Sequence, residues 1–237
     1  DLIAGLPLET FDIFKDSFNT GYKIGANMLQ MGFLKLLHGA PLEQTAEENG
    51  IAYSKTPPYE ILENKWLSAE EMAQLHKIED ALERFCNSGR FSYTLQYLES
   101  VCISARNSSP FDFFLGFGEN VQAHYKTALD EFCENAYRYL CTINGVDKTI
   151  LRDTMALDRL ATNSMGRLPS CLKVKDDDLK KAVIALAANA DTAPKKAMRR
   201  GVVLLYSQNK KVAWVDYAEN LRDKVSKKWQ INFKENW

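Results

Sequence analysis

The sequence lacks any apolar run near the roughly 20 residues that a membrane-spanning helix needs. Its longest candidate, Ala182–Ala188, consists mostly of alanine. No basic segment precedes the opening residues, so no signal peptide is expected, and the missing start methionine indicates that Asp1 is not a natural beginning. We therefore expect a cytoplasmic protein that has no membrane partner.

Closely spaced metal ligands are absent too. The five cysteines are odd in number and spread thinly, which argues against a secreted disulfide framework and favours reduced thiols. They are Cys86, Cys102, Cys133, Cys141 and Cys171. No two stand at the spacing of a zinc knuckle or an iron–sulfur loop. His38, His76 and His124 are too scattered for a three-histidine metal site, and no Walker loop, nucleophile elbow or zinc-protease helix occurs. The sequence predicts no metal site and no catalytic residue in this chain.

The first forty residues have an α/β rhythm. Leu2–Pro7 is a short apolar run that Gly and Pro end, which is typical of a buried strand. A helical pattern follows from Glu9 to Lys23, and a second apolar run covers Met28–Leu37. The pattern predicts one βαβ unit with parallel strands. Because such a unit cannot bury itself, it needs neighbours on both sides.

From Pro57 onward the pattern is helical. Ser68 and Glu71 form a capping box at the start of a helix with one apolar face. That face carries Met72, Leu75, Ile78, Leu82 and Phe85. Further helical patterns cover residues 91–102, 109–140 and 176–188, and Gly116 and Gly118 are candidate interruptions of the second. Asp147 is expected to cap another helix that extends to about residue 160. Two β-rich runs, 201–206 and 212–217, flank a polar turn and predict a hairpin.

The predicted fold is mostly α, and α+β overall. It has an N-terminal strand–helix–strand segment at residues 1–55, then a helical domain with a C-terminal β-hairpin at residues 56–237.

Several short motifs follow one another in a specific order. The opening Asp-Leu-Ile-Ala-Gly-Leu-Pro-Leu-Glu-Thr resembles the late barrel strand of radical-SAM enzymes, and the second run with its His-Gly-Ala-Pro-Leu turn resembles the next strand. Ala40 stands where that turn usually has threonine. The later motifs are Pro57-Pro58-Tyr59-Glu60, Trp66-Leu67-Ser68, Asn87-Ser88-Gly89-Arg90-Phe91 and Ser109-Pro110-Phe111-Asp112-Phe113-Phe114.

Together these motifs resemble the uncharacterised C-terminal domain that follows the barrel in cobalamin-binding radical-SAM proteins, often labelled Fe–S oxidoreductases. The resemblance covers roughly residues 1–140 and is loose afterwards. It implies that residues 1–55 are a remnant of the barrel. It also implies that the intact protein uses a [4Fe–4S] cluster, S-adenosylmethionine and cobalamin. In that family the first strand lies beside S-adenosylmethionine, so Ile3 and Gly5 are the implied cofactor-binding residues.

The resemblance implies no cofactor held by this chain alone, which should be inactive in isolation. We expect an accessory domain that covers the barrel and shapes the substrate pocket of a radical-SAM Fe–S oxidoreductase. Its partner would be the N-terminal part of the same polypeptide. In this chain we expect the open edge of the first strand to be buried against the helical body or against a second copy of the chain.

The basic tail favours a different class of function. Residues 195–237 hold eleven Lys or Arg against four Asp or Glu, a net charge of +7, which leaves −8 elsewhere. With Tyr206, Trp214 and Trp229 interspersed, this tail could form an RNA or tRNA surface. The basic residues in question are Lys195, Lys196, Arg199, Arg200, Lys210, Lys211, Lys224, Lys227 and Lys228. An intramolecular docking surface for the acidic remainder explains the same polarity.

Two further sets have a simpler structural interpretation. Phenylalanines 111, 113, 114 and 117 are expected in the core, with a substrate-facing wall as the alternative. Six glutamates could supply acid–base groups, but helix surfaces need such residues for solubility. They are Glu60, Glu63, Glu70, Glu71, Glu79 and Glu83.

Overall fold

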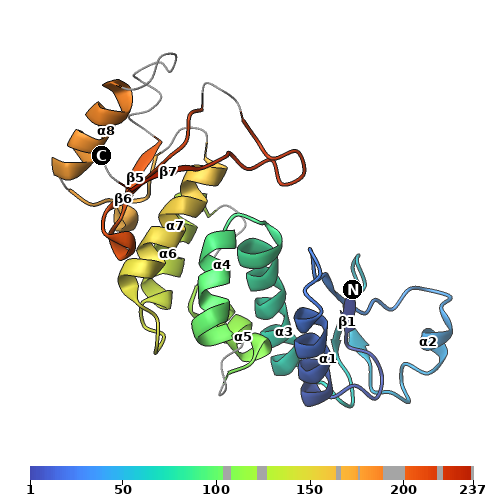
Figure 1. Ribbon diagram of the computed structural model, residues 1–237. Helices are drawn as coiled ribbons and strands as arrows, with labels where there is room; N and C mark the ends of the chain where they lie inside the picture. The colour runs from blue at the N-terminus through green and yellow to red at the C-terminus, as the bar shows by residue number, and fades with distance from the viewer. Residues whose placement is uncertain are drawn as a thin grey trace. The chain divides into compact units, whose positions relative to one another are not determined.

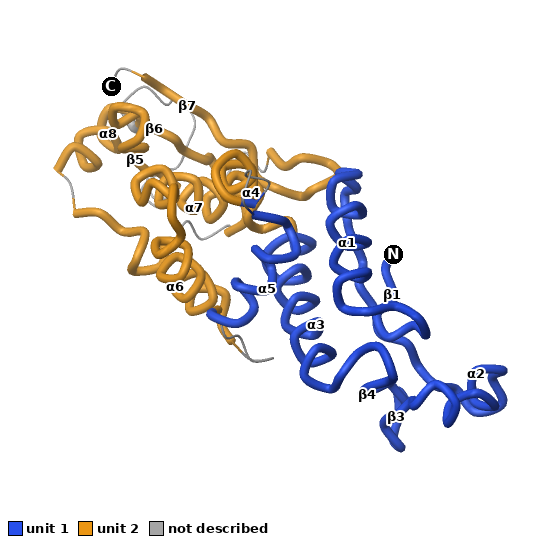
Figure 2. Tube along the Cα trace, turned by 90° about the horizontal axis from the view of Figure 1, so that it is seen from below, with its two compact units in different colours: residues 1–88, 103–120 blue, residues 89–102, 121–237 orange. Residues whose placement is uncertain are grey.

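The computed structural model describes residues 1–103, 108–121, 127–163, 167–175, 177–188, 201–217 and 221–235. Within them the fold is mostly helical with small sheets, so the predicted α+β class is confirmed. Contacts separate the chain into two compact units, which Figure 2 shows in different colours. Unit 1 combines Asp1–Ser88 with Ile103–Asn120, and unit 2 combines Gly89–Cys102 with Val121–Trp237. The domain boundary after residue 55 stays a prediction.

Unit 1 begins with the strand–helix–strand segment and continues into helices. Its elements are β1 (Leu2–Ala4), α1 (Phe11–Lys23), β2 (Met31–Phe33), α2 (Pro41–Gln44), β3 (Ala52–Tyr53), β4 (Ile61–Glu63), α3 (Ala69–Ala81), the π-helical η1 (Leu82–Asn87) and α5 (Pro110–Asn120).

The βαβ unit forms as predicted. β1 and β2 pair in parallel, with Leu2 opposite Met31, and α1 connects them and packs on β1 (Figure 1). The helix begins after Thr10, whose hydroxyl accepts the N–H of Ile13 at 3.4 Å, a side-chain cap of an otherwise unpaired donor. The second strand is shorter than the predicted run Met28–Leu37, because only residues 31–33 keep regular pairing with β1.

The helix α3 starts at the predicted capping box. The Glu71 N–H donates to Ser68 Oγ at 3.3 Å, and the Ser68 N–H donates to Glu71 Oε2 at 2.8 Å. Its apolar face and the continuation into η1 are buried as the periodicity predicts. The buried residues are Met72, Leu75, Ile78, Leu82 and Phe85.

Aromatic rings fill the core of unit 1. All four phenylalanines of α5 are buried, which confirms that they belong to the core. The rings of Phe18 in α1 and Phe111 in α5 meet edge to face with centroids 5.7 Å apart, a favoured aromatic geometry. Stacking of Phe85 on Phe117, at 4.5 Å, joins η1 to the same cluster.

The glycines of α5 do not interrupt it. The helix runs through Gly116 and Gly118, and Gly118 lies directly against α3. A Cβ at position 118 would lie 2.3 Å from the carbonyl oxygen of Lys77. The helix ends at Asn120, whose side-chain amide donates to the Gly116 carbonyl at 2.8 Å.

Three short elements of unit 1 were not predicted. They are α2 and the antiparallel pair β3–β4, and an isolated bridge joins Lys35 to Glu60 just beyond β2. Segments of two to four residues are too short to show a helical or strand period.

Unit 2 holds the remaining elements. They are α4 (Ser92–Leu98), α6 (Leu129–Leu140), α7 (Lys148–Thr162), the 3₁₀ turn η3 (Ser170–Leu172), α8 (Asp177–Ala188), β5 (Val202–Leu205), the 3₁₀ turn η4 (Tyr206–Gln208), β6 (Lys211–Trp214) and β7 (Asn232–Lys234). The π-helical η2 (Glu99–Ile103) also belongs here except for its last residue, Ile103, which belongs to unit 1.

Two helix predictions for unit 2 differ in outcome. The Asp147 cap of α7 is confirmed, since its carboxylate accepts the N–H groups of Thr149 and Ile150 at 2.7 and 3.0 Å. The continuous helical pattern over 109–140 was wrong, because α5 stops at Asn120 and α6 begins only at Leu129. The apolar spacing on either side belongs to two separate helices.

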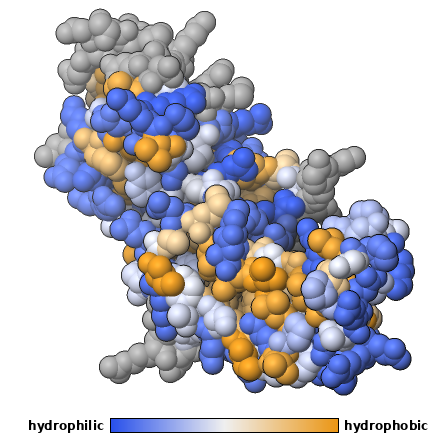
Figure 3. Space-filling view, turned by 90° about the vertical axis from the view of Figure 1, so that its right-hand side faces the viewer, coloured by the Kyte–Doolittle hydropathy of each residue, from blue (hydrophilic) through white to orange (hydrophobic). Residues whose placement is uncertain are grey.

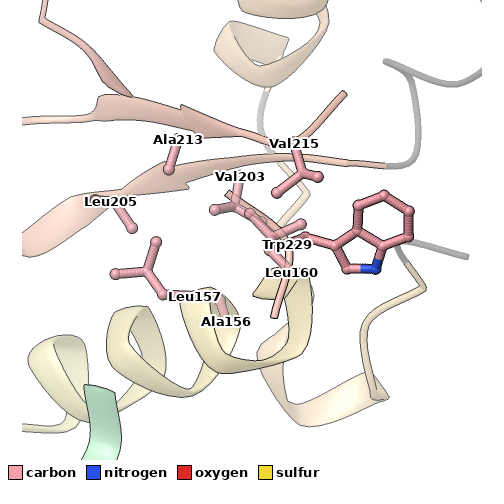
Figure 4. Packing of buried hydrophobic residues seen from close by; sticks show 8 residues of the cluster. All are labelled: Ala156, Leu157, Leu160, Val203, Leu205, Ala213, Val215 and Trp229. Atoms are coloured by element: carbon pink, nitrogen blue, oxygen red, sulfur yellow. The ribbon is translucent and has the colours of Figure 1, made fainter. Parts of the chain in front are cut away.

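The predicted hairpin is confirmed and gains a third strand. β5 and β6 pair antiparallel, with Val203 opposite Ala213, and β7 pairs with β6 through Phe233 opposite Ala213. The sheet packs on α7. Figure 4 shows Trp229 beside Leu160, with the small and branched side chains of helix and sheet interdigitating. This cluster consists of Ala156, Leu157, Leu160, Val203, Leu205, Ala213, Val215 and Trp229.

Helix α7 also buries charged groups. Ten of its 15 residues are buried, including Arg152, Asp153, Asp158 and Arg159. The Asp158 carboxylate accepts the backbone N–H groups of Tyr93 and Thr94 at 2.9 Å and the Thr94 hydroxyl at 2.7 Å. A side chain of α7 thus satisfies the first turn of α4. Burial still raises the pKa of Asp158 to about 6, despite these hydrogen bonds.

No helix in the described parts of the chain is both long and apolar enough to cross a membrane.

We predict that Gly118→Ala lowers the free energy of unfolding by about 1–3 kcal/mol, because the new methyl group must push α5 away from α3. Chemical denaturation monitored by circular dichroism measures this. Gly32→Ala is the matched control, since its Cβ would meet only the Leu2 carbonyl oxygen at 3.9 Å. Equal stability of both variants would contradict the close helix approach.

A second prediction concerns pH. The folded-state pKa of Asp158 lies above its unfolded value, so its contribution to stability is full near pH 4 and is lost as pH rises through about 6. Thr94→Val keeps the carboxylate and should keep this pH dependence, whereas Asp158→Asn should remove it. Denaturation at pH 4 and pH 7 tests the difference, expected at up to about 3 kcal/mol. The same pH slope in both variants would contradict this assignment.

Candidate functional site

The candidate site lies at the end of β1, where Ile3 and Gly5 were the predicted cofactor-binding residues. In barrels of parallel strands, chemistry takes place at the carboxyl ends of the strands. Gly5 directly follows the carboxyl end of β1, and Ile3 is the middle residue of that three-residue strand. Ile3 is 48% exposed, while Gly5 is buried.

The outer edge of β1 has no strand beside it in the described residues. The Leu2 N–H donates to the Gln30 carbonyl at 2.8 Å, and the Ala4 carbonyl accepts the Leu34 N–H at 2.9 Å. Leu2 and Ala4 therefore direct their backbone groups toward β2. Because bonding groups alternate along a strand, those of Ile3 point to the opposite, open edge.

Burial of this edge against the helical body was expected, and the described residues do not provide it. The sheet has only the order β1–β2 there, and the Ile3 side chain keeps about half of its surface exposed. The other expectation, that a second copy of the chain buries the open edge of β1, stays a prediction. An unpaired strand edge is a site for pairing with another strand.

Gly5 is required by the protein's own backbone and packing. Its φ of +94° is one that side chains rarely adopt, and the space of a Cβ is bounded by Met72 and Leu34 at 3.5 and 3.6 Å. The Asn64 amide donates to the Gly5 carbonyl at 2.9 Å, so that oxygen already has a partner. The carbonyl of Gly5 is therefore taken, whereas both backbone groups of Ile3 are left, within the described residues, for a ligand or a strand.

The sequence pattern did not indicate Glu9 as a candidate site residue. It lies in the turn between β1 and α1, and its Oε2 is buried without a hydrogen-bond partner in the described residues. Burial raises the pKa of this carboxyl group. A buried carboxylate oxygen without a donor is costly, so a donor from outside the described residues would stabilise it.

Unit 1 also exposes many large apolar side chains. Figure 3 shows such side chains gathered over unit 1, in the lower part of the view. The most exposed are Leu8 at 73% and Ile24 at 76%. The others with substantial exposure are Ile3, Leu6, Ile13, Met28, Leu37, Tyr59 and Leu62. Contiguous apolar surface on a globular unit marks an interaction site.

Three of the six candidate glutamates, Glu60, Glu71 and Glu83, have structural partners. Glu60 pairs with His76 at 2.8 Å, and the His76 ring stacks on Phe33 with centroids 3.7 Å apart. Glu71 closes the capping box, and Glu83 accepts the Asn87 amide at 2.6 Å. The exposed His38 contacts Glu43 at 2.9 Å, while His124 lies outside the described residues. These contacts favour the structural interpretation.

The cysteines do not build a metal site. All five are free thiols, and no group of three metal-ligating side chains gathers in the described parts of the chain. Two of them do meet, since the thiols of Cys133 and Cys171 share a hydrogen bond. It holds the pKa of Cys171 below the ordinary thiol range and raises that of Cys133.

The basic tail is only partly described, because Lys195, Lys196, Arg199 and Arg200 lie outside the described residues. Lys210 pairs with Asp178, and Lys211 pairs with Glu235. Trp229 is buried in the core of unit 2, so its ring does not offer a face for stacking bases.

A basic loop remains exposed in the tail. Arg222 bridges to Trp229, and between them lie Lys224, Lys227 and Lys228. Asp223 shapes the loop, because its Oδ1 accepts the N–H groups of Val225 and Ser226 at 3.1 and 2.6 Å.

Comparison with known families gives one match. A family model described as "Protein of unknown function (DUF4080)" matches residues 47–237. No curated protein matches the chain significantly.

We predict that Glu9→Gln stabilises the chain at pH 7. Its folded pKa is raised, so the ionised form costs stability at pH 7, and this cost vanishes at pH 4, where Glu9 is protonated. Thermal unfolding at both pH values measures the change. Glu43→Gln is the control with opposite sign, since the Gly39 N–H holds the pKa of Glu43 below its usual range. A Glu9→Gln variant that loses stability at pH 7 would contradict the unpartnered carboxylate.

Proposed function

The chain belongs to the DUF4080 family, and we propose that it is the C-terminal accessory part of a cobalamin-dependent radical-SAM enzyme. In this proposal residues 1–55 are the last strands of the barrel. The rest covers the barrel, shields reactive intermediates from solvent and shapes the substrate pocket. The chain by itself is inactive, and the intact polypeptide is an Fe–S oxidoreductase or a related transferase.

The unpaired outer edge of β1 is the observation that carries this proposal. β1 and β2 are parallel, as strands of such a barrel are, and parallel strands normally have neighbours and covering helices. The backbone groups of Ile3 point to the empty side. A preceding barrel strand would pair with them and cover the Ile3 side chain.

Two further features support a preceding barrel strand beside β1. The orphan Oε2 of Glu9 lies in the turn that follows β1, where a donor from a neighbouring barrel turn would reach it. The exposed apolar side chains of unit 1 would lose their contact with water under the same cover. A second copy of the chain is the competing occupant, and sedimentation of the isolated chain would detect it as a stable dimer.

The residues of this chain fit only part of the implied cofactor set. A [4Fe–4S] cluster needs closely spaced cysteine ligands, and the described cysteines do not gather in threes, so the preceding barrel would have to supply them. Ile3 and Gly5 remain the residues that we propose to lie beside S-adenosylmethionine, which would supply the radical chemistry when bound. Gly5 contributes by letting the chain turn sharply after β1. All five cysteines are free thiols, which supports the proposal that the protein is cytoplasmic.

The test uses a charge placed on the open edge. We expect Ile3→Glu to leave the stability of the 237-residue chain nearly unchanged, because the side chain is half exposed there. In the full-length protein, purified anaerobically, the same change should lower the unfolding temperature and the visible charge-transfer absorption of the cluster. Ile184→Glu in α8, at a residue 68% exposed, is the matched control and should do neither.

Two results would refute the proposal. One is a full-length protein without a three-cysteine cluster loop or cluster absorption. The other is a full-length protein that tolerates Ile3→Glu as well as Ile184→Glu.

RNA binding through the tail is the second candidate function. The observation that favours it is the basic loop 222–228, in which Arg222, Lys224 and Lys227 are exposed around a turn fixed by Asp223. A filter-binding titration with bulk tRNA at several salt concentrations tests it. Affinity that falls steeply with salt, and falls further in Lys224→Glu, supports this candidate; binding without salt dependence rejects it.

A further inference from the structure

A pocket of about 320 Å³ opens in unit 2, far along the chain from the open edge of β1. This volume is at the lower end of the range that holds small organic ligands. Its walls come from α6, from the first turns of α7, from the segment after η3 and from η4. The lining residues are Tyr137, Lys148, Thr149, Arg152, Val174 and Tyr206.

Arg152 is held rigidly in the pocket wall and is only 8% exposed. Its Nε donates to the Leu172 carbonyl at 3.0 Å, and its Nη1 donates to the Leu204 carbonyl at 2.7 Å. The same Nη1 pairs with Asp153 Oδ1 at 2.9 Å. Three acceptors therefore fix the guanidinium before any ligand arrives, so binding would cost little side-chain entropy.

The remaining nitrogen of Arg152, Nη2, has no partner in the described residues. It is not among the buried atoms that lack one, so it keeps contact with solvent. Since Arg152 lines the pocket, Nη2 is the end of the guanidinium that reaches this opening. Asp153 cannot turn to it, because its Oδ2 accepts both the N–H and the hydroxyl of Ser207 at 2.7 Å.

The lining has two cationic side chains and no carboxylate. Lys148 stands exposed beside Arg152 on α7 and forms no ion pair in the described residues. Because Nε and Nη1 of Arg152 are already bonded, the guanidinium cannot grip a flat carboxylate with two parallel hydrogen bonds. A single N–H donor next to a lysine point charge suits a tetrahedral oxyanion such as phosphate, which offers acceptors in several directions.

Two tyrosines supply the apolar part of the pocket. The Tyr206 ring lies 5.4 Å from the guanidinium carbon of Arg152, within the range of a cation–π contact. Tyr137 lines the pocket from α6, and burial raises the pKa of its hydroxyl to about 12. It therefore stays a neutral donor at physiological pH. Aromatic walls of this kind accept a planar ring.

We propose that this pocket binds a small molecule that joins a phosphate group to a planar ring, as a nucleoside monophosphate does. Arg152 and Lys148 take the phosphate, and Tyr137 and Tyr206 take the ring. This site is separate from the open edge of β1, and it does not rest on the barrel proposal.

Calorimetric titration of the 237-residue chain with adenosine 5′-monophosphate is the first measurement. Saturable binding is expected below about 1 mM, the weak end for a small solvent-open site. Inorganic phosphate should compete with it, and adenosine should bind at least about tenfold more weakly. Absence of saturation up to about 10 mM with both the nucleotide and inorganic phosphate would overturn the proposal. Adenosine binding as tightly as the nucleotide would overturn the phosphate assignment.

Charge reversal at the rim is the second measurement. Lys148→Glu should weaken binding of the nucleotide about tenfold or more, because it places a carboxylate beside the phosphate. Lys175→Glu is the matched control: it is equally exposed and one residue beyond the lining Val174, and it should change affinity less than about twofold. Both lysines are at the surface, so both variants should fold. Equal losses would show general attraction to a positive surface and would reject the pocket.

Discussion

The Asp158 carboxylate accepts three hydrogen bonds from the first turn of α4 although it is almost fully buried in α7. Unit 2 depends on contacts of this kind. A helix that is buried on most sides must bury its charged residues too, and an unpaired buried charge costs several kcal/mol. Each buried charge of α7 therefore fixes where a distant segment can lie. Arg152 bonds to η3 and β5, and Asp153 bonds to η4. Asp158 bonds to α4, and Arg159 pairs with Asp130 of α6.

These contacts also show which parts of the fold a single sequence discloses. The capping box at Ser68 and the cap at Asp147 are local, since donor and acceptor stand within three residues, and both were predicted. The burial of Asp153 and Asp158 depends on partners more than fifty residues away in sequence. A charged residue in a helix normally indicates a solvent-facing position. Only the packed structure shows that α7 reverses this rule. Strand β7 was missed for a related reason, because three residues define no period and β6 alone makes them a strand.

Only part of the candidate site could be predicted from the sequence. The run Leu2–Pro7 was correctly taken as a strand, and its parallel partner was found, because apolar periodicity and turn residues identify both. The different roles of Ile3 and Gly5 could not be read from the sequence. The side-chain amide of Asn64, 59 residues later, donates to the Gly5 carbonyl, while about half of the Ile3 surface stays exposed. Glu9 gave no signal because a glutamate before a helix cap is ordinary; its buried oxygen appears only when the turn is folded.

The two compact units alternate along the chain, and this has a consequence for synthesis on the ribosome. Unit 1 stays incomplete until α5 emerges, because Ile103–Asn120 belongs to it. The segment Gly89–Cys102, made earlier, belongs to unit 2, and it must wait for α7 to supply the Asp158 carboxylate. Contacts that span 64 residues form late during vectorial growth, since loop closure must precede them. Neither unit can therefore be released as an autonomous fragment by one cut. Until α7 emerges, α4 lacks the helix that it packs against in the folded protein, so its side chains stay exposed to solvent while translation proceeds.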